Sequence, residues 1–148
     1  MKILRTDSEN KGFKSLVRHL DSELEVIDGD AHSFYDQYNK IDLIKNVVVI
    51  YSSEKPIGCG AFKLFKDQTV EVKRMYTLPE NRGQGIASKV LQELEIWAKD
   101  LGYTDIVLET GKTMESAIGL YQSKGYHVID NYPPYVGVDN SICFSKRL

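Results

Sequence analysis

The chain has 148 residues, 42% of them hydrophobic and 10% aromatic, which is the usual size and composition of one compact domain with its own core. The 19 lysines and arginines and 21 aspartates and glutamates give a formal net charge of −2, and no basic run is longer than a pair. This balance disfavours nucleic acid as a partner. We therefore predict a single domain over residues 1–148 that binds no nucleic acid.

Segments that would place the chain in or across a membrane are not apparent. The first residues are too polar for the core of a signal peptide, and the longest apolar run, residues 47–51, is far too short for a membrane span. These features predict a cytoplasmic protein with no membrane partner. Cys59 and Cys143 stand in apolar segments without Cys-x-x-Cys spacing, which favours buried free thiols, and the scattered histidines predict no metal site.

The first half of the chain alternates short strands and helices. Residues 2–6 read as a strand, Asp7 or Ser8 can cap a following helix, and a second short helix is expected over residues 33–39. Apolar runs over residues 47–51, 57–65 and 69–77 are separated by turn residues, which predicts three strands in an antiparallel meander. The apolar residues at helical spacing in the first helix are Phe13, Leu16, Val17, Leu20 and Leu24.

The second half begins with a long helix that opens at Gly85 and stops at Gly102. Its expected apolar face consists of Ile86, Val90, Leu91, Leu94, Trp97, Ala98 and Leu101. A strand over residues 105–108, a helix over residues 114–123 and closing strands over residues 126–129 and 141–144 follow. The pattern predicts an α/β fold of the α+β kind, a mixed and mostly antiparallel sheet of about seven strands flanked by about four helices.

The junction between the third meander strand and the long helix carries the clearest functional signal. Arg82-Gly83-Gln84-Gly85 places a row of backbone N–H groups at the positive end of a helix. The glycines permit close approach of an anion and conformations that other residues avoid, and Arg82 adds positive charge. The pattern predicts a pyrophosphate-binding loop, and an ordinary helix start after a flexible turn is the alternative.

These residues resemble the GNAT superfamily of N-acetyltransferases, whose pyrophosphate loop reads Arg/Gln-x-x-Gly-x-Gly/Ala and is matched by Arg82, Gly85 and Ala87. Residues 71–79 resemble the family's central strand, and residues 117–126 resemble its late helix motif. The resemblance implies a GNAT-like fold and an acyltransferase that uses acetyl-CoA as co-substrate. In one departure, Met114 stands where many members have an asparagine, which puts cofactor affinity rather than cofactor identity in question.

The resemblance also implies roles for individual residues. The strand segment Met75, Tyr76 and Thr77 would bind the pantetheine arm through backbone groups, and Tyr121 would lie near the thioester sulfur. The residues implied to cradle the pyrophosphate are Arg82, Gly83, Gln84, Gly85, Ile86, Ala87 and Ser88.

Acetyl transfer to an amine requires a base, a donor for the oxyanion and a proton for the leaving thiolate. Glu71 is the candidate base, because a carboxylate on a central strand is costly to bury unless it is paired or used. Strand alternation puts it on one face with Lys73 and Met75, so an ion pair with Lys73 is the alternative. Tyr121 is the candidate acid, with simple core packing as the alternative, and a backbone N–H near Met75 is the candidate oxyanion donor.

Several polar residues are candidates for binding the acceptor. His32, Tyr35 and Asn39 would share one face of the short helix, although that helix could instead simply rest its aromatic side chains on the sheet. Arg74, on the face opposite Glu71, would bind an anionic group, or a structural partner such as Asp28, Asp30 or Asp36.

Two more candidates lie in the C-terminal part. Glu109 could bind the substrate ammonium or share the base role, and a capping or surface carboxylate is the alternative. Tyr135, in the stiff segment Tyr132-Pro133-Pro134-Tyr135, would form a pocket wall or lid.

Together these features predict an N-acetyltransferase that acts on the primary amine of a small polar molecule, such as an amino acid, by direct attack in a ternary complex. The alternatives are a protein or peptide N-acetyltransferase and a non-catalytic acyl-CoA-binding module. A homodimer is compatible with the resemblance, since GNAT proteins are often dimers.

Overall fold

The computed structural model describes residues 1–29 and 43–148. Its strands form a seven-stranded sheet in the order β1-β2-β3-β4-β5-β7-β6. β4 and β5 run parallel, whereas β1–β2, β2–β3, β5–β7 and β6–β7 are antiparallel, so the predicted mixed, mostly antiparallel fold is confirmed. The helix expected over residues 33–39 lies outside the described residues. The elements are β1 (Lys2–Thr6), α1 (Lys11–Asp28), β2 (Asn46–Ser52), β3 (Lys55–Lys66), β4 (Thr69–Thr77), the 3-10 helix η2 (Pro79–Asn81), α3 (Ile86–Asp100), β5 (Asp105–Gly111), α4 (Glu115–Ser123), β6 (His127–Ile129) and β7 (Ser141–Arg147).

The chain forms two compact units. Unit 1 comprises Met1–Lys63 and Lys73–Ile96, and unit 2 comprises Leu64–Val72 and Trp97–Leu148. β3, β4 and α3 each contribute residues to both units. The pyrophosphate loop predicted from the sequence belongs to unit 1, whereas Glu71 and Tyr121 belong to unit 2.

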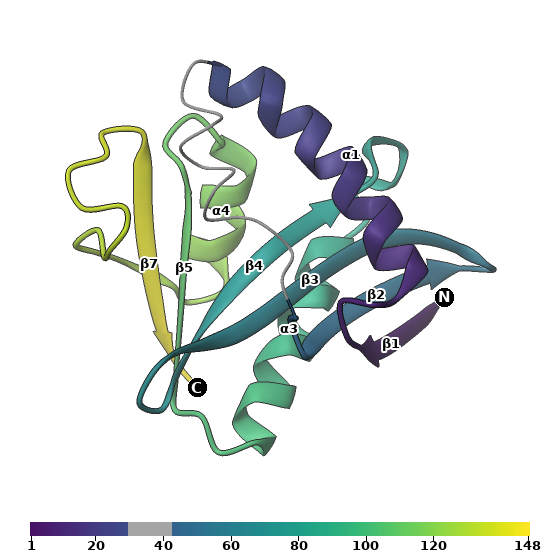
Figure 1. Cartoon of the computed structure of the whole chain (residues 1–148), viewed down its shortest axis with the longest axis horizontal. Helices are drawn as coiled ribbons and strands as arrows, with labels where there is room; N and C mark the ends of the chain where they lie inside the picture. The colour runs from purple at the N-terminus through teal and green to yellow at the C-terminus, as the bar shows by residue number, and fades with distance from the viewer. Residues whose placement is uncertain (30–42) are drawn as a thin grey trace. The chain divides into compact units, whose positions relative to one another are not determined.

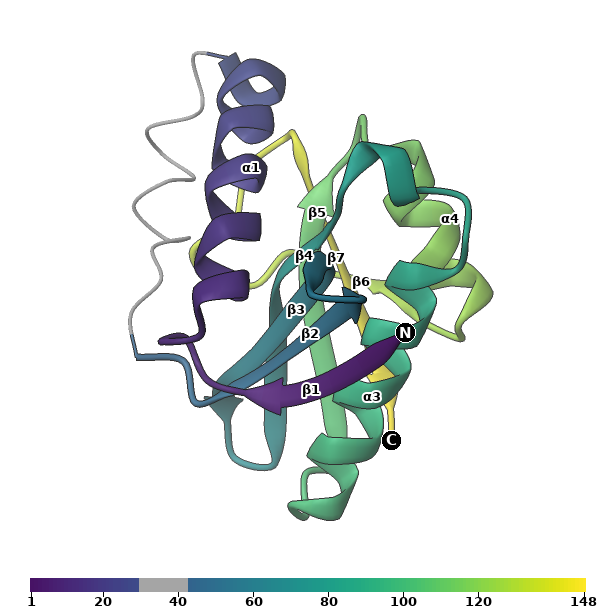
Figure 2. The ribbon, with the colours of Figure 1, turned by 90° about the vertical axis from the view of Figure 1, so that its right-hand side faces the viewer.

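In unit 1 the strands carry α1 on one face and α3 on the other (Figures 1 and 2). The expected apolar face of α1 is confirmed by burial of Phe13, Leu16, Val17 and Leu20, whereas Leu24 is only partly buried. The expected cap was wrong, because the helix begins only at Lys11. The side chain of Asn10 therefore occupies the N-cap position and accepts from the backbone N–H of Phe13 at 2.8 Å.

The first part of α3 lies close to β3 because two glycines of that strand leave room for it. A Cβ at Gly58 would lie 2.4 Å from Cγ2 of Ile86. A Cβ at Gly60 would lie 2.5 Å from Sδ of Met75 and 2.7 Å from Cγ1 of Val90. The predicted apolar face of α3 is thus largely confirmed, except at Leu101, which follows the end of the helix and is exposed.

Unit 2 is built on the short parallel ladder between Thr69–Glu71 of β4 and Asp105–Val107 of β5. β5 runs three residues beyond its predicted end because its antiparallel pairing with β7 continues to Gly111 and Ser141. Cys143 of β7 and Cys59 of β3 are free and buried, as predicted. Among the described helices, none combines the length and hydropathy needed to cross a membrane.

The close approach of α3 to β3 leads to a test at Gly60. We expect Gly60→Ala to lower the free energy of unfolding by about 1–3 kcal/mol, because the added methyl overpacks the β3–α3 contact. Urea denaturation measures the change. Gly119→Ala is the control, because no described heavy atom lies within 4 Å of a Cβ there, and in helix α4 it should stabilise by about 0.5–1 kcal/mol. Equal stability of Gly60→Ala and the parent would contradict the tight contact.

Candidate active site

The predicted pyrophosphate loop connects β4 to α3 through η2. Gly83 and Gly85 have φ of 80° and 76°, the left-handed region that favours glycine, and no described atom lies within 4 Å of a Cβ at either position. The expectation that these glycines adopt conformations unfavourable to other residues is confirmed. α3 begins at Ile86, so the N–H groups of its first turn, including Ala87 and Ser88, point beyond the helix end. The loop therefore presents backbone donors and open space at a positive helix terminus.

A buried hydroxyl lies at the end of β4, next to this loop. Thr77 is 9% exposed, and its Oγ1 is the one buried side-chain oxygen or nitrogen among the described residues that has no hydrogen-bond partner. The hydroxyl and the side chain of Ile86 both border Gly58, so the orphan group lies beside the start of α3. Buried polar groups are nearly always paired, and an orphan next to open N–H groups points to an absent ligand.

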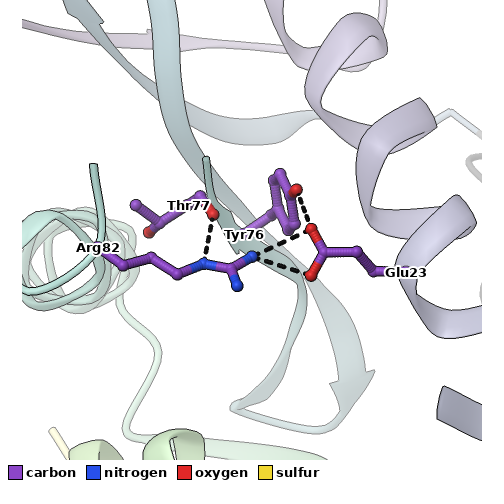
Figure 3. A network of polar contacts seen from close by, with 4 residues as sticks. All are labelled: Glu23, Tyr76, Thr77 and Arg82. Atoms are coloured by element: carbon purple, nitrogen blue, oxygen red, sulfur yellow. Dashed lines mark hydrogen bonds and ion pairs between the residues drawn. The ribbon is translucent and has the colours of Figure 1, made fainter. Parts of the chain in front are cut away.

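The guanidinium of Arg82 is held by two groups of unit 1 (Figure 3). Its Nε donates to the carbonyl oxygen of Thr77 at 2.9 Å, and its Nη2 donates to both carboxylate oxygens of Glu23 at 3.0 and 3.1 Å. The hydroxyl of Tyr76 also donates to Glu23, and the guanidinium lies 5.4 Å from the centre of the Tyr76 ring. The loop is thereby tied to α1 and to the end of β4.

The network fixes the charges of its members. Burial alone would raise the pKa of Glu23, but the hydrogen bonds from Tyr76 and Arg82 outweigh it and lower that pKa below the usual 4.5. Burial, followed by the hydrogen bond to Glu23, raises the pKa of Tyr76 from 10 to about 12. Glu23 is thus an anion and Tyr76 a neutral donor over the physiological range.

Arg74 interrupts the regular course of β4. Its φ of 61° lies in the left-handed region, which is costly for a residue with a side chain. The shared face predicted for Glu71, Lys73 and Met75 relied on unbroken alternation, so that inference does not hold across Arg74. Its guanidinium is almost fully buried and donates to Oδ1 of Asp21 on α1 at 2.6 Å. The structural partner is therefore Asp21, which was not among the three aspartates considered.

In unit 2, Glu71 is buried on β4, as expected for a carboxylate with a function or a partner. It is 5% exposed, and its Oε2 accepts a hydrogen bond of 2.8 Å from the hydroxyl of Tyr132, which is 8% exposed. The Tyr132 ring meets that of Phe65 edge to face at 4.7 Å between centroids. The candidate base thus has a phenol donor that the sequence did not identify.

Tyr121 lies in the core of unit 2. Its ring lies 5.7 Å from that of Tyr126 and 6.0 Å from that of Phe144, between centroids. Burial, and after it the charge of Glu109, raises the pKa of Tyr121 above its usual value, so the phenol stays protonated. Two of the predicted residues, the candidate acid and Glu109, thus interact electrostatically within unit 2. Glu109 is only partly buried on β5.

The remaining acceptor candidates have different outcomes. Tyr135 is fully buried and packs beside Tyr132, with 5.8 Å between the ring centroids. His32, Tyr35 and Asn39 lie outside the described residues, as do Asp30 and Asp36. The residues that the sequence did not indicate are Asp21, Glu23 and Tyr132. Only Tyr132, in a Pro-Pro aromatic segment, had a local signal that could have drawn attention to it.

Comparison with known proteins identifies the family. The family model described as "Acetyltransferase (GNAT) family" matches residues 13–126. N-acetyltransferase family 8 member 2 of Rattus norvegicus is 34% identical over 104 residues, which are 70% of this chain and 42% of that protein. An IAA acetyltransferase of Azospirillum brasilense is 34% identical over 92 residues, 62% of this chain and 60% of the relative. The chain thus spans about half the length of the curated relatives that it matches.

Solved structures share the fold over almost the whole chain. A protein from Klebsiella pneumoniae, assigned as an acyl-CoA N-acyltransferase, superimposes with a TM-score of 0.82 at 28% identity, covering 99% of this chain and 97% of the other. A GNAT family acetyltransferase from Elizabethkingia anophelis with acetyl-CoA bound gives a TM-score of 0.70 at 20% identity, with coverage of 99% and 97%. The resemblance in the loop is confirmed by the match of the family model: the chain belongs to the GNAT acetyltransferase family.

Proposed function

We propose that this chain is an acetyl-CoA-dependent N-acetyltransferase that acetylates the primary amine of a small polar molecule. The observation that carries the proposal is the β4–α3 loop, where left-handed Gly83 and Gly85 precede a free helix N-terminus and the orphan hydroxyl of Thr77 lies beside it. A row of N–H donors at a positive helix end is suited to a pyrophosphate. Family membership and acetyl-CoA in the Elizabethkingia structure support the same cofactor.

The backbone and the side chains around the loop have different proposed roles in binding the cofactor. We assign the pyrophosphate to the backbone N–H groups from Gly83 to Ser88, which need no side chain to reach it. The side chain of Arg82 is engaged by Thr77 and Glu23, so its main role is to hold the loop in place. The hydroxyl of Thr77 and the backbone groups of Met75 and Thr77 are assigned to the pantetheine arm.

The chemistry requires two proton transfers, for which unit 2 has candidates. Glu71 accepts a proton from the substrate ammonium, which makes the nitrogen lone pair available for attack on the thioester carbonyl. Tyr121 donates a proton to the departing sulfur, and its raised pKa keeps that proton in place at neutral pH until then. The second proton that the nitrogen loses as the amide forms restores the Tyr121 phenol. The backbone N–H of Met75 follows the left-handed residue Arg74, and we assign it to the developing oxyanion.

The charged residues near the candidate acid indicate that the acceptor is a positively charged amine. Glu109 is a partly buried carboxylate near the candidate acid, and it is suited to binding a substrate ammonium. Arg74 is occupied by Asp21, so a carboxylate on the substrate would need another partner. The proposed substrate is therefore a compact primary amine, with amino acids as one class within it.

The first test is turnover. Incubation of the protein with acetyl-CoA and a panel of amino acids, polyamines and peptides should release CoA thiol with one class of small amine. Glu71→Gln should lower that turnover by about a hundredfold or more, and Tyr121→Phe by about tenfold to a hundredfold. Stimulation by peptides alone would point to a protein acceptor. Acetyl-CoA binding without turnover across the panel would support a non-catalytic module.

The loop can be tested separately from the chemistry. Alanine at Gly85 must adopt a left-handed conformation, which costs about 1–2 kcal/mol and will displace the neighbouring N–H groups. We expect Gly85→Ala to weaken acetyl-CoA binding about tenfold by calorimetry. Gly102→Ala is the control, because it also places alanine at a positive φ, of 93°, but after the last turn of α3. Equal loss of affinity in both variants would contradict the assignment of the site.

The Glu23 network has a pH signature. Since the pKa of Glu23 is lowered in the folded protein, its contribution to stability is present above the usual value of 4.5 and is lost as pH falls through the folded value. Glu23→Gln should therefore be less stable than the parent near neutral pH, by less than about 1 kcal/mol for a partly exposed group, and the difference should vanish in acid. Urea denaturation at a series of pH values measures this. A difference that persists unchanged in acid would contradict the proposed charge on Glu23.

A further inference from the structure

The loop between β6 and β7 contains Tyr132, which forms a hydrogen bond with the candidate base, Glu71. The hydroxyl of Tyr132 donates to Oε2 of Glu71 at 2.8 Å, although the two residues are 61 positions apart in the chain. Both are more than nine-tenths buried. The bond is therefore a contact between two buried side chains that are far apart in the sequence.

Tyr132 is itself held from several sides. Its ring is flanked by Phe65 at 4.7 Å and by Tyr135 at 5.8 Å between centroids. The residue before it, Asn131, donates its side-chain amide to the carbonyl oxygens of Tyr135, Val138 and Ser141 at 3.1, 3.3 and 3.1 Å. The phenol thus has a fixed direction, as a group that positions another one must have.

The protonation state of Tyr132 makes it the donor in its hydrogen bond with Glu71. Burial, and after it the charge of Glu71, raises the pKa of Tyr132 far above its usual value, so the phenol remains a donor at any pH at which the protein works. A donor of this kind favours the ionised form of a carboxyl group. The other titratable groups that act on Tyr132 are Cys143 of β7 and Tyr135 of the same loop.

We propose that Tyr132 is a positioning residue for the candidate base: its hydroxyl fixes the orientation of the Glu71 carboxylate by donating to one of its two oxygens. The inference rests on the proposed function, in which Glu71 accepts the proton of the amine. It gives Tyr132 a role that the cofactor and acceptor assignments do not include.

The direct test is a carbon-13 NMR titration of the Glu71 side-chain carboxyl in the full chain, with the signal assigned by its absence in Glu71→Gln. In Tyr132→Phe the midpoint should move to higher pH by about one unit, a tenfold change in proton affinity, because the ring packing stays and only the donor is lost. Incorporation of 3-fluorotyrosine at position 132 should move it to lower pH, because a more acidic phenol donates more strongly. This second variant keeps the ring and hydroxyl, so it remains informative if Tyr132→Phe does not fold.

Kinetics then link the titration to the reaction. With acetyl-CoA and the most active amine of the panel, the acid limb of kcat should follow the NMR midpoint in each variant, while KM for acetyl-CoA stays within about twofold. Tyr103→Phe, which removes a phenol elsewhere in unit 2, should leave the limb unchanged.

The outcomes distinguish a failure of the inference about Tyr132 from a failure of the proposed function. An unmoved midpoint in both Tyr132 variants, together with inactive Glu71→Gln, would overturn the inference and leave the proposed function standing. Full turnover by Glu71→Gln would overturn the assigned base and the inference together. A loss of rate in Tyr132→Phe that is equal at every pH would show a merely structural role and would also overturn the inference.

Discussion

The left-handed conformation of Arg74 is the constraint on which the proposed cofactor half of the site depends. It lies in β4 between the candidate base and the loop that we assign to the pyrophosphate, and it costs about 1–2 kcal/mol for a residue with a side chain. The ion pair between the buried guanidinium of Arg74 and the partly exposed carboxylate of Asp21 offsets part of this cost, and the thiol of Cys59 donates to the carbonyl oxygen of Arg74 at 3.4 Å. A strained residue held by several partners is typical of sites where backbone direction matters.

Helix α1 contributes to this arrangement through two carboxylates. Asp21 binds Arg74 of β4, and Glu23 binds Arg82 at the start of the loop together with Tyr76 (Figure 3). The helix thus covers the apolar face of the unit 1 strands and also fixes both ends of the segment that carries Met75 and Thr77. A movement of α1 would displace the side chains of Arg74 and Arg82, because each arginine has a carboxylate partner on α1. The segment assigned to the cofactor is therefore mechanically linked to an element far from it in sequence.

The extent to which the sequence anticipated this structure depends on whether the signal was local. The strands and helices followed from apolar periodicity, and the loop followed from Gly83 and Gly85, because positive φ is a property of the residue itself. The cap at Asn10 was missed because Asp7 and Ser8, just before it, are residue types that cap helices equally well. Local patterns resolve the type of an element better than its first residue.

The contacts in the candidate site could not be predicted from local sequence patterns. Asp21 and Glu23 are two of several acidic residues on the polar side of a helix, and nothing local distinguishes them from solvated ones. The conformation of Arg74 could not be expected either, since arginine has no preference for positive φ. Such features arise from tertiary packing, which selects one polar residue among many by bringing a partner within hydrogen-bond distance.

Two carboxylates accept a hydrogen bond from a tyrosine, Glu23 in unit 1 and Glu71 in unit 2, and the partners of Glu23 bear on its proposed role. Glu23 binds both a phenol and the Arg82 guanidinium, and a cation at such a distance holds a carboxylate ionised and makes it a poor acceptor of protons. Glu71 has the phenol of Tyr132, a neutral donor that orients one carboxylate oxygen without cancelling the charge. An arginine in place of Tyr132 would give a stronger bond and a weaker base. A tyrosine provides orientation while leaving the carboxylate able to take up a proton, which is what a general base for an ammonium requires.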